Sequence, residues 1–344
     1  MIHGGEIYGK KIEYDFSVNL NPCPCPVSVM QALKDAAGET GHYPDIYQKD
    51  FRERIAESEG VRPDEITGTN GASELLSALI SYLHPKNVLL PVPSFYGYRH
   101  ALNMVPGCRI TEHVFLSDYT LGDDILAAIR EDTDVLILGN PNNPTGKCID
   151  RDLLRDIVYR CRDTGTALIV DECFLKLSIN GSSVKQYIGR VPNIFIAQSY
   201  TKLFSIPGVR VGYCISDKEN IEGLRRYLPE WNLSVYAEKA GIEGAGVLMD
   251  MDYLRQSLKM IEDGREELYR GFNELGIDYY LTDTSFILLK CEADLYSYML
   301  DRGVLVRDCS NYQGLSKGYY RVAVKDSASN QVILKLLSGL KSGM

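Results

Sequence analysis

The sequence predicts an α/β protein with a large domain on a mostly parallel sheet and a smaller α+β domain. The chain has 344 residues, 45% of them apolar and 24% charged, so it can bury a large core and would normally form more than one domain. Between about residues 45 and 215, short apolar runs alternate with helical stretches, which is typical of a parallel sheet with crossover helices. After a helical, small-residue-rich segment expected at 231–245, three apolar runs predict the strands of the smaller domain: SFILLK, GVLVRD and GYYRVAVK.

The order of these elements divides the chain into three regions. Residues 1–40 are expected to form an N-terminal arm that belongs to the small domain. Residues 41–240 should form the large domain and residues 241–344 the small α+β domain. Four segments of the large domain, taken in chain order, carry the residues that indicate a function.

The first segment is GTNGASELL, at residues 68–76, and it predicts the start of a helix. Small residues precede Ser73, Glu74 and an apolar run. The free N–H groups and the dipole at the start of a helix favour a phosphate group. An ordinary capped helix without a ligand would show the same pattern.

The second and third segments are apolar strands that end in polar residues. VLILGNPNNPTG, at 135–146, carries Asn140 and Asn143 in the turn after its strand, and ALIVDECF, at 167–174, ends its strand at Asp171. Ligands of open α/β folds bind at the carboxyl edge of the sheet, where these side chains should emerge. A carboxylate there can keep the pyridine nitrogen of a cofactor protonated. A plain loop and an acid that caps the next turn are the alternatives for each segment alone.

The fourth segment places Lys202 and Arg210, eight residues apart, after the apolar strand IFIAQS. A lysine that forms a Schiff base needs an aldehyde, which is most often pyridoxal 5'-phosphate (PLP). The phosphate of that cofactor needs a planar, permanently charged donor, which arginine supplies. A solvated surface lysine is the alternative for this motif alone. The four segments in this order together predict a PLP site.

In these motifs the chain resembles the fold-type I PLP enzymes of the class I/II aminotransferase family, from about residue 3 to about residue 335. The resemblance implies the aspartate aminotransferase-like (PLP-transferase) fold. It also implies that Lys202 forms the Schiff base and that Asp171 faces the pyridine nitrogen. Asn143 matches the residue that bonds the 3'-oxygen of the ring, and Phe95 the aromatic that stacks on it. The phosphate contacts implied are Gly71, Ala72, Ser73, Ser199, Thr201 and Arg210.

Further positions concern assembly and substrate. Tyr43 matches a tyrosine that reaches the cofactor phosphate of the neighbouring subunit, so the resemblance implies a homodimer with shared sites. Arg307 and Arg321 are each expected where an apolar strand reaches its polar end, and a guanidinium there can bind a carboxylate or phosphate with two parallel hydrogen bonds. Arg321 matches the arginine that binds the substrate carboxylate in the family, and a surface ion pair is the alternative.

Phe174 stands where transaminating relatives usually carry a tyrosine that also bonds the 3'-oxygen of the ring. Phenylalanine keeps the packing and lacks that hydrogen bond, which contributes ~0.5–1.5 kcal/mol. Phe174 therefore counts among the cofactor contacts and makes ordinary transamination less expected.

Within the family, the chain is similar to the L-threonine O-3-phosphate decarboxylases of cobalamin side-chain synthesis, in which phenylalanine at this position is usual. The runs that carry this similarity are HGGEI from His3, DFSVNLNP from Asp15, DECF from Asp171, RDCSNYQGL from Arg307 and YYRVAV from Tyr319. The similarity implies a lyase for a phosphorylated amino acid, with substrate contacts from His3, Asn19, Arg307 and Arg321. An aminotransferase of the histidinol-phosphate type stays an alternative, and a non-catalytic sensor that binds PLP is a third.

The composition favours a cytosolic enzyme that acts on small molecules. A net charge of −9 and a pI near 5.2 argue against a nucleic acid or an anionic membrane as partner. The first residues, MIHGGEIYGK, lack the apolar stretch of a signal peptide, and no apolar run approaches the ~18 residues of a membrane span. Nine scattered cysteines predict reduced thiols. Cys23 and Cys25 have no second pair at zinc spacing, so no metal site is expected.

Overall fold

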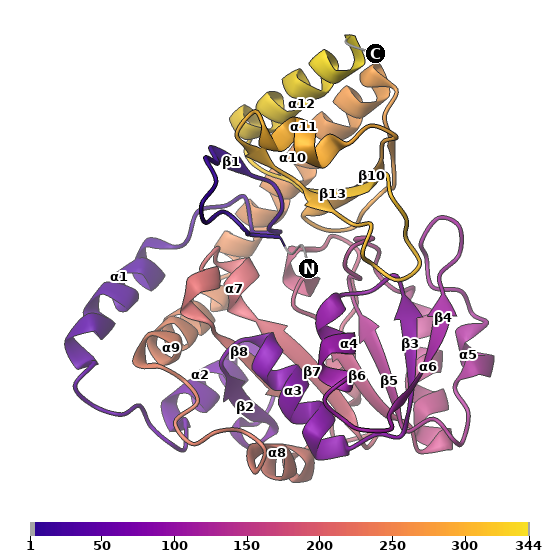
Figure 1. Cartoon of the computed structure of the whole chain (residues 1–344). Coiled ribbons are helices and arrows are strands. Elements are labelled where there is room, and N and C mark those ends of the chain that lie inside the picture. The colour runs from indigo at the N-terminus through magenta and orange to yellow at the C-terminus, as the bar shows by residue number, and fades with distance from the viewer. Residues whose placement is uncertain (1–3, 343–344) are drawn as a thin grey trace.

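Seven strands form the central sheet of the protein, in the order β2-β8-β7-β6-β5-β3-β4 (Figure 1). The computed structural model describes residues 4–342. Strand β8 runs antiparallel to both of its neighbours, and the other neighbouring strands pair in parallel. The strands are β2 (Ile66–Thr69), β3 (Asn87–Val92), β4 (Arg109–Val114), β5 (Val135–Gly139), β6 (Ala167–Asp171), β7 (Ile194–Ser199) and β8 (Gly212–Ile215). The mostly parallel sheet predicted from the alternating runs is confirmed.

Helices cover both faces of this sheet because its strands bury side chains on both sides. In β6, for example, Leu168 and Val170 join the hydrophobic cluster under α2, α6 and α9, whereas Ile169 joins the cluster under α3, α4 and α8. The helices of this part of the chain are α1 (Val27–Ala36), α2 (Lys49–Glu59), α3 (Ala72–Leu83), α4 (Tyr96–Leu102), α5 (Ile125–Ala128), α6 (Arg151–Thr164), α7 (Tyr200–Leu203), α8 (Lys218–Arg225) and α9 (Val235–Met249).

A smaller domain lies above the carboxyl edge of the large sheet (Figure 1). Its antiparallel sheet has the order β12-β13-β10-β9, and β1 of the N-terminal arm pairs in parallel with β11. The elements are β1 (Tyr14–Asp15), β9 (Asp278–Tyr279), β10 (Phe286–Lys290), β11 (Val304–Leu305), β12 (Arg307–Asp308), β13 (Tyr319–Ala323), α11 (Leu295–Leu300) and α12 (Ser327–Ser342).

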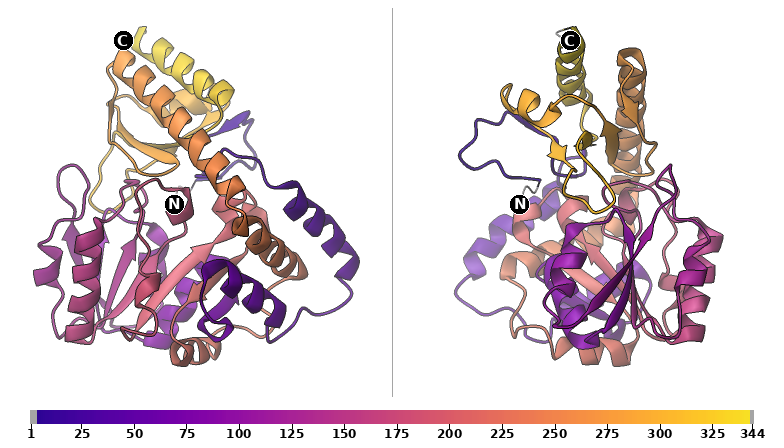
Figure 2. Two further views of the ribbon diagram at one scale, coloured as in Figure 1. Left: turned by 180° about the vertical axis from the view of Figure 1, so that it is seen from behind. Right: turned by 45° about the vertical axis from the view of Figure 1, so that its right-hand side comes forward.

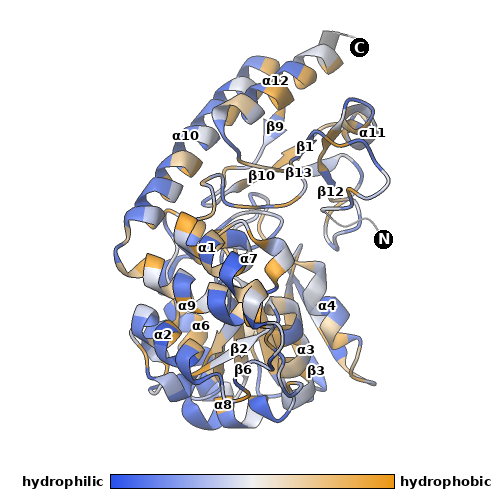
Figure 3. Ribbon diagram, turned by 90° about the vertical axis from the view of Figure 1, so that its left-hand side faces the viewer, coloured by the Kyte–Doolittle hydropathy of each residue, from blue (hydrophilic) through white to orange (hydrophobic). Residues whose placement is uncertain are grey.

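Helix α10 (Asp252–Leu275) connects the two domains as a single continuous element (Figure 2). Leu254 and Ile261 of its first half belong to a core cluster of the large domain, and Leu268 and Phe272 of its second half belong to the core of the small domain. Its outward surface is largely hydrophilic (Figure 3). None of the helices within residues 4–342 is long and apolar enough to cross a membrane.

Two elements differ from the sequence-based expectation. The helix expected at 231–245 begins only at Val235, because Ser234 before it has an extended backbone and its hydroxyl caps the helix by accepting from the Ala237 N–H. The run GVLVRD forms two short strands instead of one, since β11 pairs with β1 and β12 pairs with β13. Leu305 therefore pairs with Asp15 of the N-terminal arm, whereas Arg307 pairs with Arg321.

Candidate active site

A cavity of about 230 Å³ lies between the large sheet and the small domain. The N-terminal arm and both domains contribute to its wall. Of the residues predicted to form the site, those that line the cavity are Asn19, Ala72, Ser73, Phe95, Asn143, Asp171, Phe174, Ser199, Thr201, Lys202, Arg210, Arg307 and Arg321. The fold thus brings together residues from segments more than 300 positions apart.

Three of the expected residues that the structure describes do not line the cavity. Gly71 lies directly behind its wall, next to Arg210. Tyr43 is 79% exposed and packs on Trp231, with ring centroids 4.8 Å apart, away from the cavity of its own chain. Asn140 is fully buried and binds the backbone of Ser182 and Ile149, so its expected position facing a ligand is wrong. His3 lies outside the described residues.

One end of the cavity is built to hold an anion. Helix α3 begins at Ala72, and its N-cap Gly71 has φ of 78°. A Cβ atom on Gly71 would lie 2.5 Å from Nη2 of Arg210, so only glycine allows the guanidinium this close to the helix start. The hydroxyls of Ser199 and Thr201 lie 2.7 Å apart beside them. Helix N–H groups, hydroxyls and a guanidinium together suit a phosphate.

Asp171 emerges at the end of β6 with both carboxylate oxygens held. The hydroxyl of Tyr98 donates to Oδ2 over 2.8 Å, and the backbone N–H of Cys173 donates to Oδ1 over 3.0 Å. Burial and the nearby carboxylate raise the pKa of Tyr98 well above its usual value, so Tyr98 stays a donor. Tyr98 packs edge-on against Phe95, with ring centroids 5.6 Å apart.

Lys202 lies at the base of the same cavity, in the short helix α7 after β7. Burial lowers the pKa of its amine to about 8, together with repulsion from Arg321 and Arg210 and against the attraction of Cys173 and Asp171. A neutral amine is therefore available near physiological pH, and a neutral lysine is a nucleophile.

Two arginines of the small domain close the other end of the cavity. Arg321 donates from Nη2 to the Ser17 carbonyl over 2.6 Å and from Nη1 to Oδ1 of Asn143. Arg307 donates from Nη2 to Oδ1 of Asn311 over 2.7 Å. Both guanidiniums are almost fully buried.

The substrate end of the cavity also contains buried polar atoms without partners. Within residues 4–342, Nε of Arg321 and Oδ1 of Asn19 are buried and make no hydrogen bond. Buried polar groups are normally paired. Among the described residues that line the cavity, four are cationic and only Asp171 is acidic. The cavity therefore suits ligands with more than one anionic group.

The structure corrects one placement and adds residues that the sequence did not indicate. Arg321 was expected at the polar end of a strand, but it is the middle residue of β13, where strand alternation turns it toward the cavity while Tyr320 and Val322 face the core. Tyr98, Tyr312 and Cys173 also line the cavity. For Tyr98 a signal existed, since it stands three residues after Phe95 in the same short aromatic run, FYGY.

The sequence matches the family described as aminotransferase class I and II over residues 11–337. It is 32% identical over 337 residues to a threonine-phosphate decarboxylase of Salmonella typhimurium, covering 96% of this chain and 92% of that protein.

Solved structures give a consistent result. The fold is similar to a histidinol-phosphate aminotransferase from Clostridium acetobutylicum, with a TM-score of 0.88, 26% identity and coverage of 96% of this chain and 100% of that one. A double mutant of Thermus thermophilus aspartate aminotransferase gives a TM-score of 0.82 at 19% identity, over 96% of this chain and 92% of that one. The aspartate aminotransferase-like fold predicted from the sequence is confirmed.

Proposed function

The chain belongs to the class I and II aminotransferase family, whose members bind PLP, and from this premise we propose that it is a PLP-dependent L-threonine O-3-phosphate decarboxylase. The observation that carries the proposal is the pair of buried arginines, Arg307 and Arg321, in the same cavity as Lys202 and Asp171. A substrate with a phosphate and a carboxylate would match two guanidiniums. The 32% identical relative from Salmonella typhimurium, named threonine-phosphate decarboxylase, supports this choice of substrate.

The residues present fit the cofactor. Arg210, the start of α3 and the hydroxyls of Ser199 and Thr201 would hold its phosphate, and Asp171 would pair with its pyridine nitrogen. When bound, PLP supplies an electron sink for the electrons released at Cα of the substrate. Asp171 acts as the fixed negative charge behind that sink, and the amine of Lys202, with its pKa lowered to about 8, can carry a proton to or from Cα.

Arg307 and Arg321 would decide which group leaves Cα by fixing where the anionic ends of the substrate lie. Arg321 is already oriented by the Ser17 carbonyl and Asn143, and its buried Nε has no partner, so it could donate to a ligand. Bidentate binding by a planar guanidinium fixes both position and orientation. His3 remains a further candidate contact for the substrate.

A histidinol-phosphate aminotransferase is the second candidate function. It is favoured by the similarity to the enzyme of Clostridium acetobutylicum, which covers 96% of this chain. Its amine substrate would bring one phosphate and no carboxylate, although its acceptor, 2-oxoglutarate, would bring two carboxylates to the same arginines. We prefer the decarboxylase because of the runs DECF and RDCSNYQGL and because of the 32% identical relative.

The assembly proposed is a homodimer with shared sites. Tyr43, which is 79% exposed, would reach the phosphate end of the site in the second subunit. Its exposure next to Trp231 is consistent with a surface that a second copy covers.

Product analysis tests the proposed reaction. Protein loaded with PLP and given L-threonine O-3-phosphate, without any 2-oxo acid, should release carbon dioxide and aminopropanol phosphate over many turnovers. Lys202→Ala should abolish this release, whereas Lys218→Ala, a change at an exposed lysine of α8, should not. Turnover of histidinol phosphate that depends on 2-oxoglutarate, with no carbon dioxide from threonine phosphate, would instead establish the aminotransferase.

A further inference from the structure

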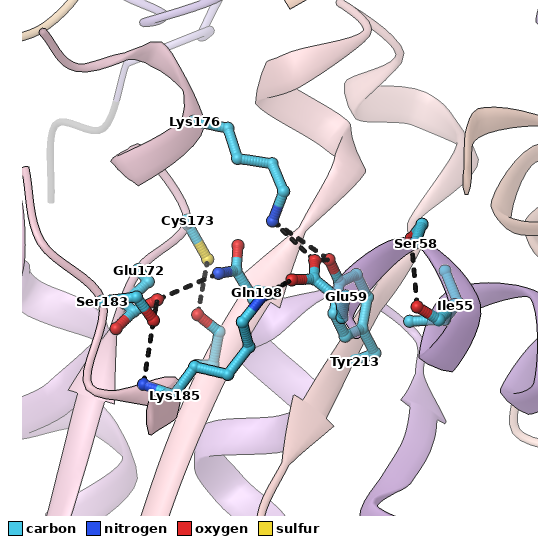
Figure 4. Close-up of polar contacts among 11 residues, drawn as sticks. Ile55, Ser58, Glu59, Glu172, Cys173, Lys176, Ser183, Lys185, Gln198 and Tyr213 are labelled. Atoms are coloured by element: carbon cyan, nitrogen blue, oxygen red, sulfur yellow. Dashed lines mark hydrogen bonds and ion pairs between the residues drawn. The ribbon is translucent and has the colours of Figure 1, made fainter. Parts of the chain in front are cut away.

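A cluster of charged and polar side chains lies beside the end of β6 (Figure 4) and, apart from Cys173, does not line the cavity. Its centre is Glu172, the residue after Asp171. Because successive strand residues point to opposite faces, Asp171 enters the cavity and Glu172 points into the protein beneath it. Glu172 has no exposed surface, and the reaction proposed above gives it no role.

Three donors hold the Glu172 carboxylate. Oε2 accepts from the Ser183 hydroxyl over 2.8 Å and from the Gln198 amide over 3.1 Å, and Oε1 accepts from the Val184 backbone N–H over 3.0 Å. Two of these donors belong to the far end of the loop 172–184, and the third belongs to the neighbouring strand β7. Glu172 therefore closes the loop on itself and ties it to the sheet.

The same loop is anchored a second time, on α2. Glu59 at the end of α2 accepts from Lys176 over 2.6 Å, from Lys185 over 2.9 Å and from the Tyr213 hydroxyl over 2.5 Å. Figure 4 shows Lys176 and Tyr213 meeting at this carboxylate. Both lysines form ion pairs with Glu59, so the hydrogen bonds of Glu172 come from neutral donors alone.

The loop 172–184 carries two residues of the candidate active site. Cys173 and Phe174 line the cavity, and the Cys173 N–H binds Oδ1 of Asp171. Gln198, the partner of Glu172 on β7, directly precedes Ser199. A movement of the Glu172 side chain would thus reach the Asp171 carboxylate through one turn of backbone and the phosphate end through one strand residue.

Resting on the proposed function, we propose that Glu172 is a positioning residue of the reaction, which holds the loop 172–184 so that Asp171 and Phe174 keep their orientation in the cavity. Its carboxylate touches neither substrate nor cofactor. Its three hydrogen bonds set the place of the turn at Cys173, and through that turn the direction in which the Asp171 carboxylate points.

The surroundings of Glu172 also give its action a pH dependence. Burial, with repulsion from Glu59, raises its pKa to about 7 against the hydrogen bonds of Val184 and Ser183 and the attraction of Lys176. Above that pH the ionised carboxylate accepts from all three donors. Below it, the carboxyl group is neutral and its hydrogen bonds lose the charge that strengthens them, so the loop is held less firmly.

The test compares Glu172→Ala and Glu172→Gln in the PLP-loaded enzyme. Glu172→Ala should lower kcat by about tenfold to a hundredfold, because small misplacements of catalytic groups have effects of this size. Its KM should change little, since the two arginines are untouched, and its Kd for PLP should change less than its kcat, because only Gln198 links Glu172 to the phosphate end. Glu172→Gln keeps a possible partner for each of the three donors but is neutral at every pH, so at pH 8 it should show the lower kcat that wild type reaches below about pH 7, well above that of Glu172→Ala. Its kcat should not fall further between pH 8 and pH 6, whereas that of wild type should fall.

Turnover is expressed per bound cofactor, so that loss of folded protein is not counted as loss of positioning. Glu57→Gln, the same change at an exposed residue of α2, should behave as wild type. Wild-type kcat per cofactor in Glu172→Ala would overturn the proposal. If that variant does not fold, a pH profile of Glu172→Gln identical to wild type would overturn it as well. Absence of a cofactor absorption band in the wild-type protein would overturn the proposed function and this inference together.

Discussion

The carboxylate of Asp171 accepts one hydrogen bond from its own motif, from the Cys173 N–H, and one from Tyr98, which lies far outside it. The sequence identifies Asp171, Lys202 and Arg210 because each stands in a short run at the end of a strand. It does not identify Tyr98 as the partner of Asp171, 73 positions away. Nor does it indicate that Asn143 and Arg321, 178 positions apart, bind one another. The first pair depends on where α4 meets the end of β6, and the second on where the turn after β5 meets β13. Only the folded chain defines these positions.

Tyr98→Phe should lower kcat for carbon dioxide release by about tenfold to a hundredfold. The change keeps the ring against Phe95 and removes only the donor to Asp171, and a hydrogen bond to a charged group contributes about 1.5–3 kcal/mol. The Kd for PLP should stay near that of wild type. Tyr159→Phe, on the surface of α6, is the matched control. Unchanged turnover in Tyr98→Phe would mean that the Cys173 N–H alone orients Asp171.

The start of α3 shows what can be predicted for an element. Small residues before an apolar run indicate a helix start near Ala72, and the helix begins there. The contact that makes this start an anion site could not be predicted. Arg210 belongs to a separate loop, and its own left-handed backbone brings its guanidinium next to Gly71. In the same way, the division of GVLVRD into β11 and β12 follows from two different pairing partners, which the apolar pattern of the run does not contain.

Gly71→Ala should raise the Kd for PLP by about tenfold or more, because a methyl group there would displace the Arg210 guanidinium, and each ~1.4 kcal/mol of lost binding is tenfold. A titration of PLP absorbance measures this constant. Gly107→Ala separates backbone strain from the displacement of Arg210. Gly107 also has a positive φ, of 80°, but an added Cβ there would meet no other atom within 4 Å. It should lower the melting temperature slightly through backbone strain and leave the Kd unchanged. Equal Kd values in both variants would show that the contact with Arg210 is unimportant.

At the scale of the whole molecule, the cavity is complete in a single chain except for what Tyr43 is proposed to add. If a second subunit supplies Tyr43, two inactive variants should complement each other. In co-expressed Tyr43→Ala and Lys202→Ala chains, a mixed dimer has one site with both native residues, so random pairing restores about a quarter of all sites.

The control for this mixing experiment is Lys202→Ala with Asp171→Ala. Both residues line the cavity of the same chain, so no mixed dimer contains an intact site, and activity should not return. Sedimentation should show a dimer for each variant. A monomer, or a mixture of Tyr43→Ala and Lys202→Ala without recovery, would contradict the shared site.

Helix α10 has a mechanical consequence for the arginines above the cavity. It passes from one core to the other near Gly264, where an added Cβ would lie 2.6 Å from Cγ1 of Val324, the residue that follows β13. The helix and the strand of Arg321 therefore pack closely here, and the nearest contact is the Val324 side chain. The first half of α10 is fixed in the large domain through Leu254 and Ile261. Because Arg307 and Arg321 lie on paired strands of one sheet, a tilt of the small domain on α10 would carry both arginines together and change their height above Lys202 without changing the distance between them.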